Sequence, residues 1–120
     1  MTDLVGTCPK NFWLEWLAEG GCAGAPDDGE EYSWYTRCER MARRARPGDR
    51  FYVVAHSRLR GWAPITRVAA PPWQVEEWQI VRRGGAVACT IDAEIPGFRG
   101  LRARWWPREV EFDFPGWKTP

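Results

Sequence analysis

The sequence predicts an α+β fold that is mostly β, in a single domain spanning residues 1–120. Runs of β-branched and aromatic residues recur at short intervals, and turns containing Gly or Pro separate them. Only one segment combines helical spacing of apolar residues with a clear stop signal. We therefore expect about six strands and one or two short helices, arranged as a small curled sheet or partial barrel.

The N-terminal part of the chain holds three segments of different character. Residues 11–17, NFWLEWL, are apolar on both faces, so periodicity alone does not separate a strand from a helix, and we expect a strand. Residues 19–31 are rich in glycine and acidic residues and predict a loop. Residues 32–46 end in RCERMARRAR, which predicts a short amphipathic helix with an Arg-rich outer face. Pro47-Gly48 ends this helix.

Strands are predicted for most of the remaining chain. Residues 51–55, FYVVA, have the β-branched and aromatic content of a strand. After a turn at residues 56–58, residues 59–70 form the returning strand, in which Gly61 and Pro64 indicate a bulge or a sheet edge. We expect further strands at residues 76–83, 86–93, 100–106 and 109–114.

Charge is distributed unevenly along the chain, although the formal net charge is only +1. Residues 1–36 hold seven acidic residues against one lysine, whereas residues 37–108 hold all fifteen arginines against six acidic residues. Residues 109–120 add three acidic residues and one lysine. A strongly basic middle indicates an anionic partner.

The nine tryptophans recur beside arginines, as in RLRGW at residues 58–62 and RARWW at residues 102–106. Tryptophan offers a flat face for stacking, and arginine offers a planar charged fork that suits phosphate. Aromatic residues interleaved with basic ones are typical of nucleic-acid and nucleotide pockets. Core packing and a GC-rich genome are the competing explanations for this composition.

Other sequence features point to a cytoplasmic protein without a cofactor. No apolar run approaches the roughly 20 residues that a membrane span needs, and residues 1–6 do not resemble a secretory signal. The four cysteines, at positions 8, 22, 38 and 89, form no CxxC pair, so we expect free thiols rather than a zinc site. The acidic residues between 27 and 31 lack an EF-hand pattern, and we expect no metal.

Two stretches carry a family resemblance. RPGDRFYVVA at residues 46–55, followed by RGWAPITRV at residues 60–68, resembles the PUA-like superfamily, which includes the EVE, ASCH and YTH branches. In that group a PGD turn commonly leads into a central strand, and a Gly-containing strand returns beside it. The ending PGFRGLRARWW at residues 96–106, with residues 112–117, is similar to the closing strands of small bacterial and phage-borne relatives.

The resemblance implies a pseudo-barrel that binds RNA or DNA, often with a modified base in an aromatic pocket. ASCH relatives carry a Gly-x-Lys-x-x-Glu-x-Arg type of motif, and some are amidohydrolases or ribonucleases. The nearest stretch here, WYTRCER at residues 34–40, contains Arg37 and Glu39 but lacks the lysine and the spacing. This departure argues against an ASCH-type enzyme.

Candidate ligand-binding residues follow from the Trp–Arg pattern. Trp34 and Tyr35 precede the basic helix, so Trp34 is a candidate wall for base stacking and Arg37 a candidate phosphate contact. An aromatic anchor between helix and sheet is the alternative for Trp34. Alternation along a strand places Arg102, Arg104 and Trp106 on one face and Trp105 in the core. A surface Trp–Arg stack made only for packing is the alternative for Trp106.

The same alternation places Arg58, Arg60 and Trp62 on one face of the returning strand. If this strand neighbours that of Trp106, the two sets merge into one basic aromatic surface. The full candidate set is Trp34, Tyr35, Arg37, Arg58, Arg60, Trp62, Arg102, Arg104 and Trp106.

Three functions are compatible with these residues. The first is a nucleic-acid-binding module, for DNA or RNA, that holds a modified or flipped-out base. The second is an enzyme of the ASCH type, for which Glu39, His56 and Glu94 are the acid–base candidates. The third is an accessory phage module that binds a protein, because Trp and Arg also anchor protein interfaces. A concave pocket of base size would favour a nucleotide, and a flat patch would favour a protein.

Overall fold

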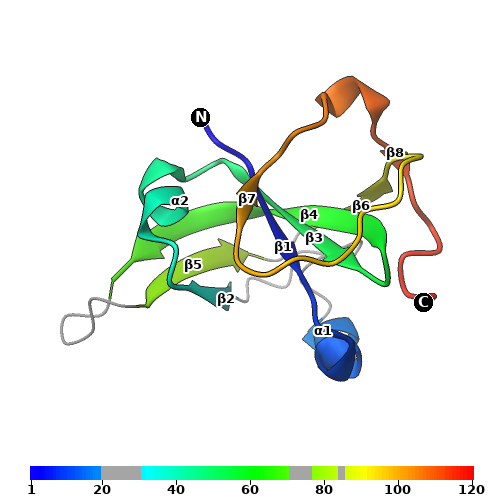
Figure 1. The fold of residues 1–120 in the computed structure, drawn as a ribbon, viewed down its shortest axis with the longest axis horizontal. Coiled ribbons are helices and arrows are strands. Elements are labelled where there is room, and N and C mark those ends of the chain that lie inside the picture. Colours follow the sequence, from blue (N-terminus) through cyan, green and yellow to red (C-terminus); the bar gives the residue numbers. More distant parts are fainter. Residues whose placement is uncertain (20–30, 71–76, 84–85) are drawn as a thin grey trace.

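The computed structural model describes residues 1–19, 31–70, 77–83 and 86–120. Within them it is mostly β, with a mixed eight-stranded sheet, two short helices and two 3-10 turns (Figure 1). The helices are α1 (Trp13–Glu19) and α2 (Glu39–Arg44), and the 3-10 turns are Lys10–Phe12 and Arg108–Val110. The strands are β1 (Leu4–Thr7), β2 (Glu31–Thr36), β3 (Arg50–Ala55), β4 (Arg58–Ala69), β5 (Trp78–Arg83), β6 (Val87–Thr90), β7 (Arg102–Ala103) and β8 (Phe112–Asp113).

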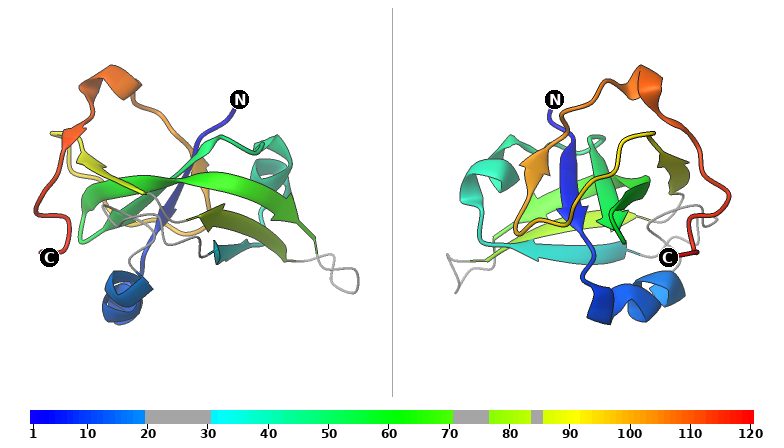
Figure 2. Two further views of the ribbon diagram at one scale, coloured as in Figure 1. Left: turned by 180° about the vertical axis from the view of Figure 1, so that it is seen from behind. Right: turned by 45° about the vertical axis from the view of Figure 1, so that its right-hand side comes forward.

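The main path of the sheet runs β2-β5-β4-β3-β1-β7, with β6 and β8 continuing from the first half of β4. The β1–β3 pair is parallel, and the other pairs are antiparallel. The long strand β4 pairs with β3 through its first half and with β5 through its second half. The sheet curls strongly (Figure 2), but β2 and β7 do not pair within the described residues, so it is not closed into a barrel.

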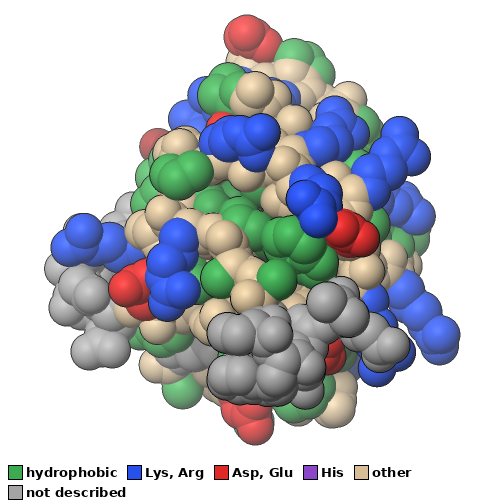
Figure 3. Space-filling model, turned by 90° about the vertical axis from the view of Figure 1, so that its left-hand side faces the viewer, with side chains coloured by type: hydrophobic (Ala, Val, Ile, Leu, Met, Phe, Trp, Pro, Cys, Tyr) green, Lys and Arg blue, Asp and Glu red, His purple; other side chains and the backbone are tan. Residues whose placement is uncertain are grey.

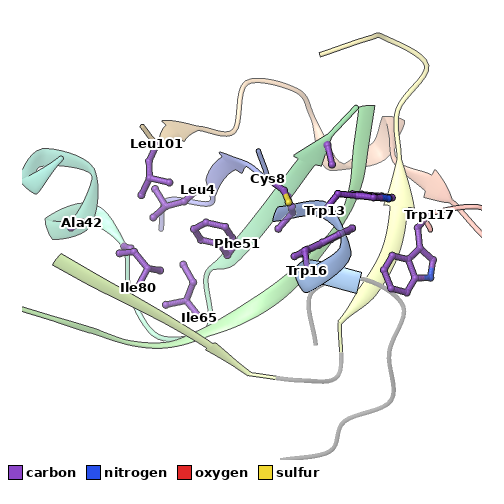
Figure 4. Packing of buried hydrophobic residues seen from close by; sticks show 13 residues of the cluster. Leu4, Cys8, Trp13, Trp16, Ala42, Phe51, Ile65, Ile80, Leu101 and Trp117 are labelled. Atoms are coloured by element: carbon purple, nitrogen blue, oxygen red, sulfur yellow. The ribbon is translucent and has the colours of Figure 1, made fainter. Parts of the chain in front are cut away.

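Two hydrophobic cores lie on opposite faces of β3, whose side chains alternate between them. Phe51, Val53 and Ala55 belong to the first core, which α1 and α2 help to cover (Figure 4). Tyr52 and Val54 belong to the second core, which includes Trp106 near the C-terminal end of the chain. Burial on both faces explains the continuous apolar run that predicts this strand.

The structure corrects the expected strand at residues 11–17, which is a 3-10 turn followed by α1. Trp13 and Trp16 are buried three positions apart, whereas Leu14 between them is 77% exposed. That spacing matches one face of a helix, not the two-residue repeat of a strand. The segment was ambiguous because its outer face also carries apolar side chains.

The predicted helix within residues 32–46 is confirmed only as α2, because β2 occupies Tyr32 to Thr36. Exposure alternates along β2, where Ser33 and Tyr35 are exposed and Tyr32, Trp34 and Thr36 are more buried. Gly48, at φ 92°, makes the turn that follows α2. The Asp49 carboxylate accepts the backbone N–H groups of Arg46 and Thr2, which ties this turn to the N-terminus.

The later strands are shorter than the sequence predicts. The strand expected at residues 100–106 is β7, of two residues, and that expected at residues 109–114 is a 3-10 turn followed by β8. The expected strand at residues 76–83 is confirmed as β5 from Trp78 onward, and that at residues 86–93 as β6. Part of the expected loop, residues 20–30, lies outside the described residues.

Candidate nucleotide-binding groove

Two adjoining cavities lie along the edge strand β2, and together they are called the β2 groove here. They have volumes of about 550 Å³ and 390 Å³ and share the lining residues Thr7, Pro9, Trp34 and Tyr35. The larger cavity is completed by Cys8, Phe12, Glu15, Trp16, Ser33 and Arg82. The smaller one is completed by Thr36, Arg37, Phe98, Arg99, Gly100 and Leu101. Both volumes lie in the range that is usual for small-molecule sites.

The groove exists because the curled sheet remains open. Its smaller cavity lies between the end of β2 and the residues that lead into β7, and these are the two unpaired ends of the main strand path. Thr7 and Pro9, at and just after the end of β1, contribute to both cavities. Side chains from opposite ends of the sheet therefore meet around one depression.

Trp34 lines both cavities of the groove. Its ring lies 5.0 Å from the ring of Phe51 on β3, at an interplanar angle of 44°. It also lies against Gly6 on β1, where an added Cβ would be 3.1 Å from Trp34 Cζ2. The side chain is half-buried, so it packs on the first core and still lines the groove. Both interpretations of Trp34, core anchor and pocket wall, describe its position.

The larger cavity, called the aromatic cavity here, has four aromatic residues in its lining: Phe12, Trp16, Trp34 and Tyr35. Trp16 is 3% exposed and forms a buried part of its lining, whereas Tyr35 is 58% exposed and stands at its mouth. Glu15 on α1 and Ser33 on β2 supply hydrogen-bonding groups. Arg82 is buried, with its guanidinium 5.8 Å from the centre of the Trp34 ring. Flat apolar walls with a few polar groups are the usual means of holding a planar ring and reading its edge.

The smaller cavity is cationic. Arg37 and Arg99 line it, and none of the described residues that line it is acidic. Both arginines are exposed, and neither has an ion pair among the described residues. Arg102 extends this positive charge, because its guanidinium lies 4.2 Å from the centre of the Phe98 ring, which also lines the cavity. Such a site attracts an anion such as phosphate.

Three of the nine predicted residues, Trp34, Tyr35 and Arg37, therefore line the β2 groove. A fourth, Arg102, lines neither cavity but contacts the ring of Phe98, which does. The sequence analysis missed Phe12, Trp16, Phe98 and Arg99. The helical spacing of Trp13 and Trp16 and the Phe98-Arg99 pair between two glycines were the available signals.

The single face expected for Arg58, Arg60 and Trp62 is wrong. The β3–β4 register shifts between Val53 and Val54, so Arg60 is an extra residue in a β-bulge. Arg58 and Arg60 lie 4.2 Å and 5.5 Å from the centre of the Phe114 ring, in the part of the molecule that packs on the first core. Trp62 instead packs on the second core, 6.5 Å from the ring of Tyr52.

The expected positions of Trp105 and Trp106 are reversed. Trp105 is 52% exposed, whereas Trp106 is 5% exposed and donates its indole N–H to Glu111 Oε2 at 2.8 Å. Strand alternation does not reach these residues because β7 ends at Ala103. Arg104, predicted to face a ligand, pairs with buried Asp3 at 3.0 Å and donates to the carbonyl of Trp106.

The merged basic aromatic surface is consequently not formed. Trp62 and Trp106 do lie near each other, since both contact Tyr52 in the second core. Trp34 packs on the first core, on the opposite face of β3. The three tryptophans therefore do not line a common pocket, and only Trp34 lines the β2 groove.

The acid–base candidates Glu39, His56 and Glu94 line neither cavity of the β2 groove. Glu39 pairs with Arg43 on α2 at 2.7 Å, and the ring of His56 packs edge-on against Trp13. The described residues contain no group of three or more His, Cys, Asp or Glu side chains that could hold a metal ion. Cys38 and Cys89 are free thiols, Cys8 is buried, and Cys22 lies outside the described residues.

No helix within the described ranges is long and apolar enough to cross a membrane. Comparison of the chain with protein-family models, with curated proteins and with solved structures finds no match, so its function has to be argued from the β2 groove.

Proposed function

We propose that this protein binds a nucleic-acid strand and holds one of its bases in the β2 groove. The observation that carries the proposal is that the two adjoining cavities share Trp34 and Tyr35 but differ in their other residues, because the larger adds the rings of Phe12 and Trp16 and the smaller adds the exposed Arg37 and Arg99. A nucleotide has the same division, with a flat aromatic base and an anionic phosphate. We also propose that the open, curled sheet of this protein is related to the pseudo-barrel of the PUA-like group.

The base enters the larger cavity and stacks on Trp34 or Tyr35. Each stacked base contributes about 1–3 kcal/mol in single-strand binding proteins. Glu15 and Ser33 accept hydrogen bonds from the edge of the base, and a modified base is accommodated by the volume of about 550 Å³. A base in a duplex is stacked and paired, so it reaches this cavity only when it is unpaired or flipped out.

The phosphate next to that base binds in the smaller cavity. Arg37 and Arg99 present planar forks of N–H donors without a competing carboxylate among the described lining residues. Electrostatic capture of this kind releases counterions, so affinity falls as salt concentration rises. The mechanism is capture of phosphate by arginine followed by stacking of the base, with no covalent step.

The test is a titration of the protein with single-stranded DNA and RNA oligonucleotides, with and without base modifications, at two salt concentrations. Intrinsic tryptophan fluorescence reports stacking on Trp34, and Arg37→Ala reports the phosphate contact. We expect quenching, with an affinity that falls with salt and falls further in the variant. Absence of quenching and of salt-dependent binding for every oligonucleotide would overturn the proposal.

A protein partner is the second candidate function, and one observation favours it. Among the described residues β2 pairs only with β5, so the other edge of β2 is open along the groove. An extended peptide can add to such an edge through backbone hydrogen bonds. Binding that is insensitive to salt and to Arg37→Ala, with a protein segment as the ligand, would favour this function over nucleic acid.

A further inference from the structure

A third cavity, called the α2 groove here, lies beside α2 and the second half of β4. It has a volume of about 490 Å³ and is lined by α2, the turn after it, the second half of β4 and the start of β5. The cationic cavity and the α2 groove are adjacent, because Thr36 lines the former, Trp78 lines the latter, and the two are partners in the β2–β5 register.

The α2 groove is positively charged around an apolar floor. Among the described residues its charged lining consists of Arg43, Arg46 and Arg67, and Trp78 and Val68 lie among them. The guanidinium of Arg43 lies 5.0 Å from the centre of the Trp78 ring. The face of the molecule that bears α2 accordingly displays Lys and Arg side chains around a hydrophobic area (Figure 3).

Two arginines of the α2 groove keep donors available for a ligand, whereas the third, Arg43, is paired with Glu39 at 2.7 Å on the exposed side of α2. Arg67 and Glu31 are 3.7 Å apart and both at least half exposed, a geometry in which an ion pair contributes about 0–1 kcal/mol. Arg46 directs one guanidinium nitrogen to the carbonyls of Arg43 and Ala45, and the described residues leave its other guanidinium nitrogens without a partner. Phosphate groups can therefore bind here without disrupting a buried interaction.

The position of Arg46 is fixed by the backbone. Its N–H donates to Asp49 Oδ2 at 2.9 Å, and Gly48 N–H donates to the carbonyl of Ile65 on β4 at 2.8 Å. Ile65 N–H in turn donates to the carbonyl of Asp49 at 2.8 Å. The Pro47-Gly48-Asp49 turn thus holds Arg46 beside the part of β4 that carries Arg67.

We propose that the α2 groove binds the sugar–phosphate backbone of the same strand whose base occupies the β2 groove. The inference rests on the proposed function and deepens it, because it specifies the ligand as a chain of several nucleotides and excludes a free nucleotide. Arg37 and Arg99 line the cationic cavity, and Arg43, Arg46 and Arg67 line the adjacent α2 groove. A path of positive charge beside aromatic platforms is how single-strand binding grooves follow a backbone.

The test compares thymidine monophosphate with thymidylate chains of increasing length, up to about 12 nucleotides, the range that one single-strand binding fold covers. We expect affinity to rise with length beyond one nucleotide and then to level off. Arg46→Ala and Arg67→Ala should each lower the slope of log affinity against log salt by about 0.7 for the longest chain. Neither variant should change binding of the monophosphate.

The control variant is Lys118→Ala, which removes one exposed positive charge from the C-terminal segment. Equal affinity for the monophosphate and the longest chain, or slopes for Arg46→Ala and Arg67→Ala that match the control, would overturn the inference and leave the proposed function standing. Failure of both ligands to bind would instead overturn the proposed function. Polyglutamate that competes as strongly as the longest chain would show a general anion surface and would also overturn the inference.

Discussion

Trp34 on β2 lies directly against Gly6 on β1, and the missing side chain of Gly6 provides the space for its ring. A Cβ on Gly6 would be 3.0 Å from Phe51 Cζ and 3.1 Å from Trp34 Cζ2. Real Cβ atoms rarely come so close to ring carbons, so either ring would have to move. The position of the Trp34 ring therefore depends on a glycine of β1 that is distant from it in the sequence.

Gly6→Ala should destabilise the fold and displace Trp34. Overpacking of a well-filled core costs about 1–3 kcal/mol, which urea unfolding would measure. Oligonucleotide affinity should fall as well, because the ring that receives the base has moved. Gly116→Ala is the matched control, since its added Cβ would meet Phe114 at an ordinary 3.5 Å. Equal stability and affinity in both variants would contradict this role of Gly6.

Tyr35→Ala should weaken binding of oligonucleotides without affecting folding. Tyr35 is 58% exposed at the mouth of the aromatic cavity, so its removal exposes little core. Loss of one stacking platform costs about 1–3 kcal/mol of binding free energy. Tyr35→Phe keeps the ring and should bind nearly as well as the original chain. If both variants bind equally, Tyr35 does not stack on the ligand.

Arg60→Met should lower the free energy of unfolding by at least about 2 kcal/mol, since hydrogen bonds from a charged group contribute about 1.5–3 kcal/mol. Arg60 is 2% exposed and donates to the carbonyls of Ala55, Trp117 and Thr119, which ties the C-terminal segment to the sheet. Burial lowers the pKa of its guanidinium, with a further contribution from Arg58. Arg58→Met, at an exposed position, is the control and should change stability much less. Thermal or urea unfolding of the two variants decides this.

Asp3 should make stability sensitive to acid. Burial by itself would raise the pKa of its carboxyl, but hydrogen bonds from Arg50 N–H and from the side chains of Arg108 and Arg104 outweigh it. The pKa of Asp3 therefore lies below its usual value of 3.8. A lowered pKa stabilises the fold above the unfolded-state pKa, and this stability is lost as pH falls through the folded-state value.

Asp3→Asn is the variant that tests this dependence. At neutral pH it should be less stable than the original chain, and the difference should shrink below about pH 4. Urea unfolding across this range is the measurement. A difference that stays constant with pH would assign the loss to packing instead of charge.

Cys38 should react with iodoacetamide before Cys89 does. Burial and the nearby Glu111 carboxylate raise the pKa of the Cys89 thiol to about 12, so almost no thiolate forms at neutral pH. Cys8 is also buried, whereas Cys38 is half-exposed at the start of α2. Mass spectrometry of peptides after brief alkylation measures the order. Early modification of Cys89 would show that the second core opens readily.

The sequence by itself determined that the fold is mostly β with short helices, and it identified some residues of the candidate site. Strong local signals predicted β3, β4 and α2, because a buried apolar run and an amphipathic stripe with a stop signal are local patterns. The clustering of Trp34, Tyr35 and Arg37 was also predictable, since these residues are nearly consecutive. The strand β2 itself was not predicted, because its residues were included in the segment that predicts the helix.

Only the tertiary structure decided which distant residues meet. The bulge at Arg60 separates Trp62 from Arg58, and the early end of β7 buries Trp106 in place of Trp105. The physical reason is that a one-residue shift in strand pairing moves every later side chain to the other face. The β2 groove likewise required the curl of the open sheet, which brings Phe98 and Arg99 beside Trp34 although more than 60 residues separate them in the sequence.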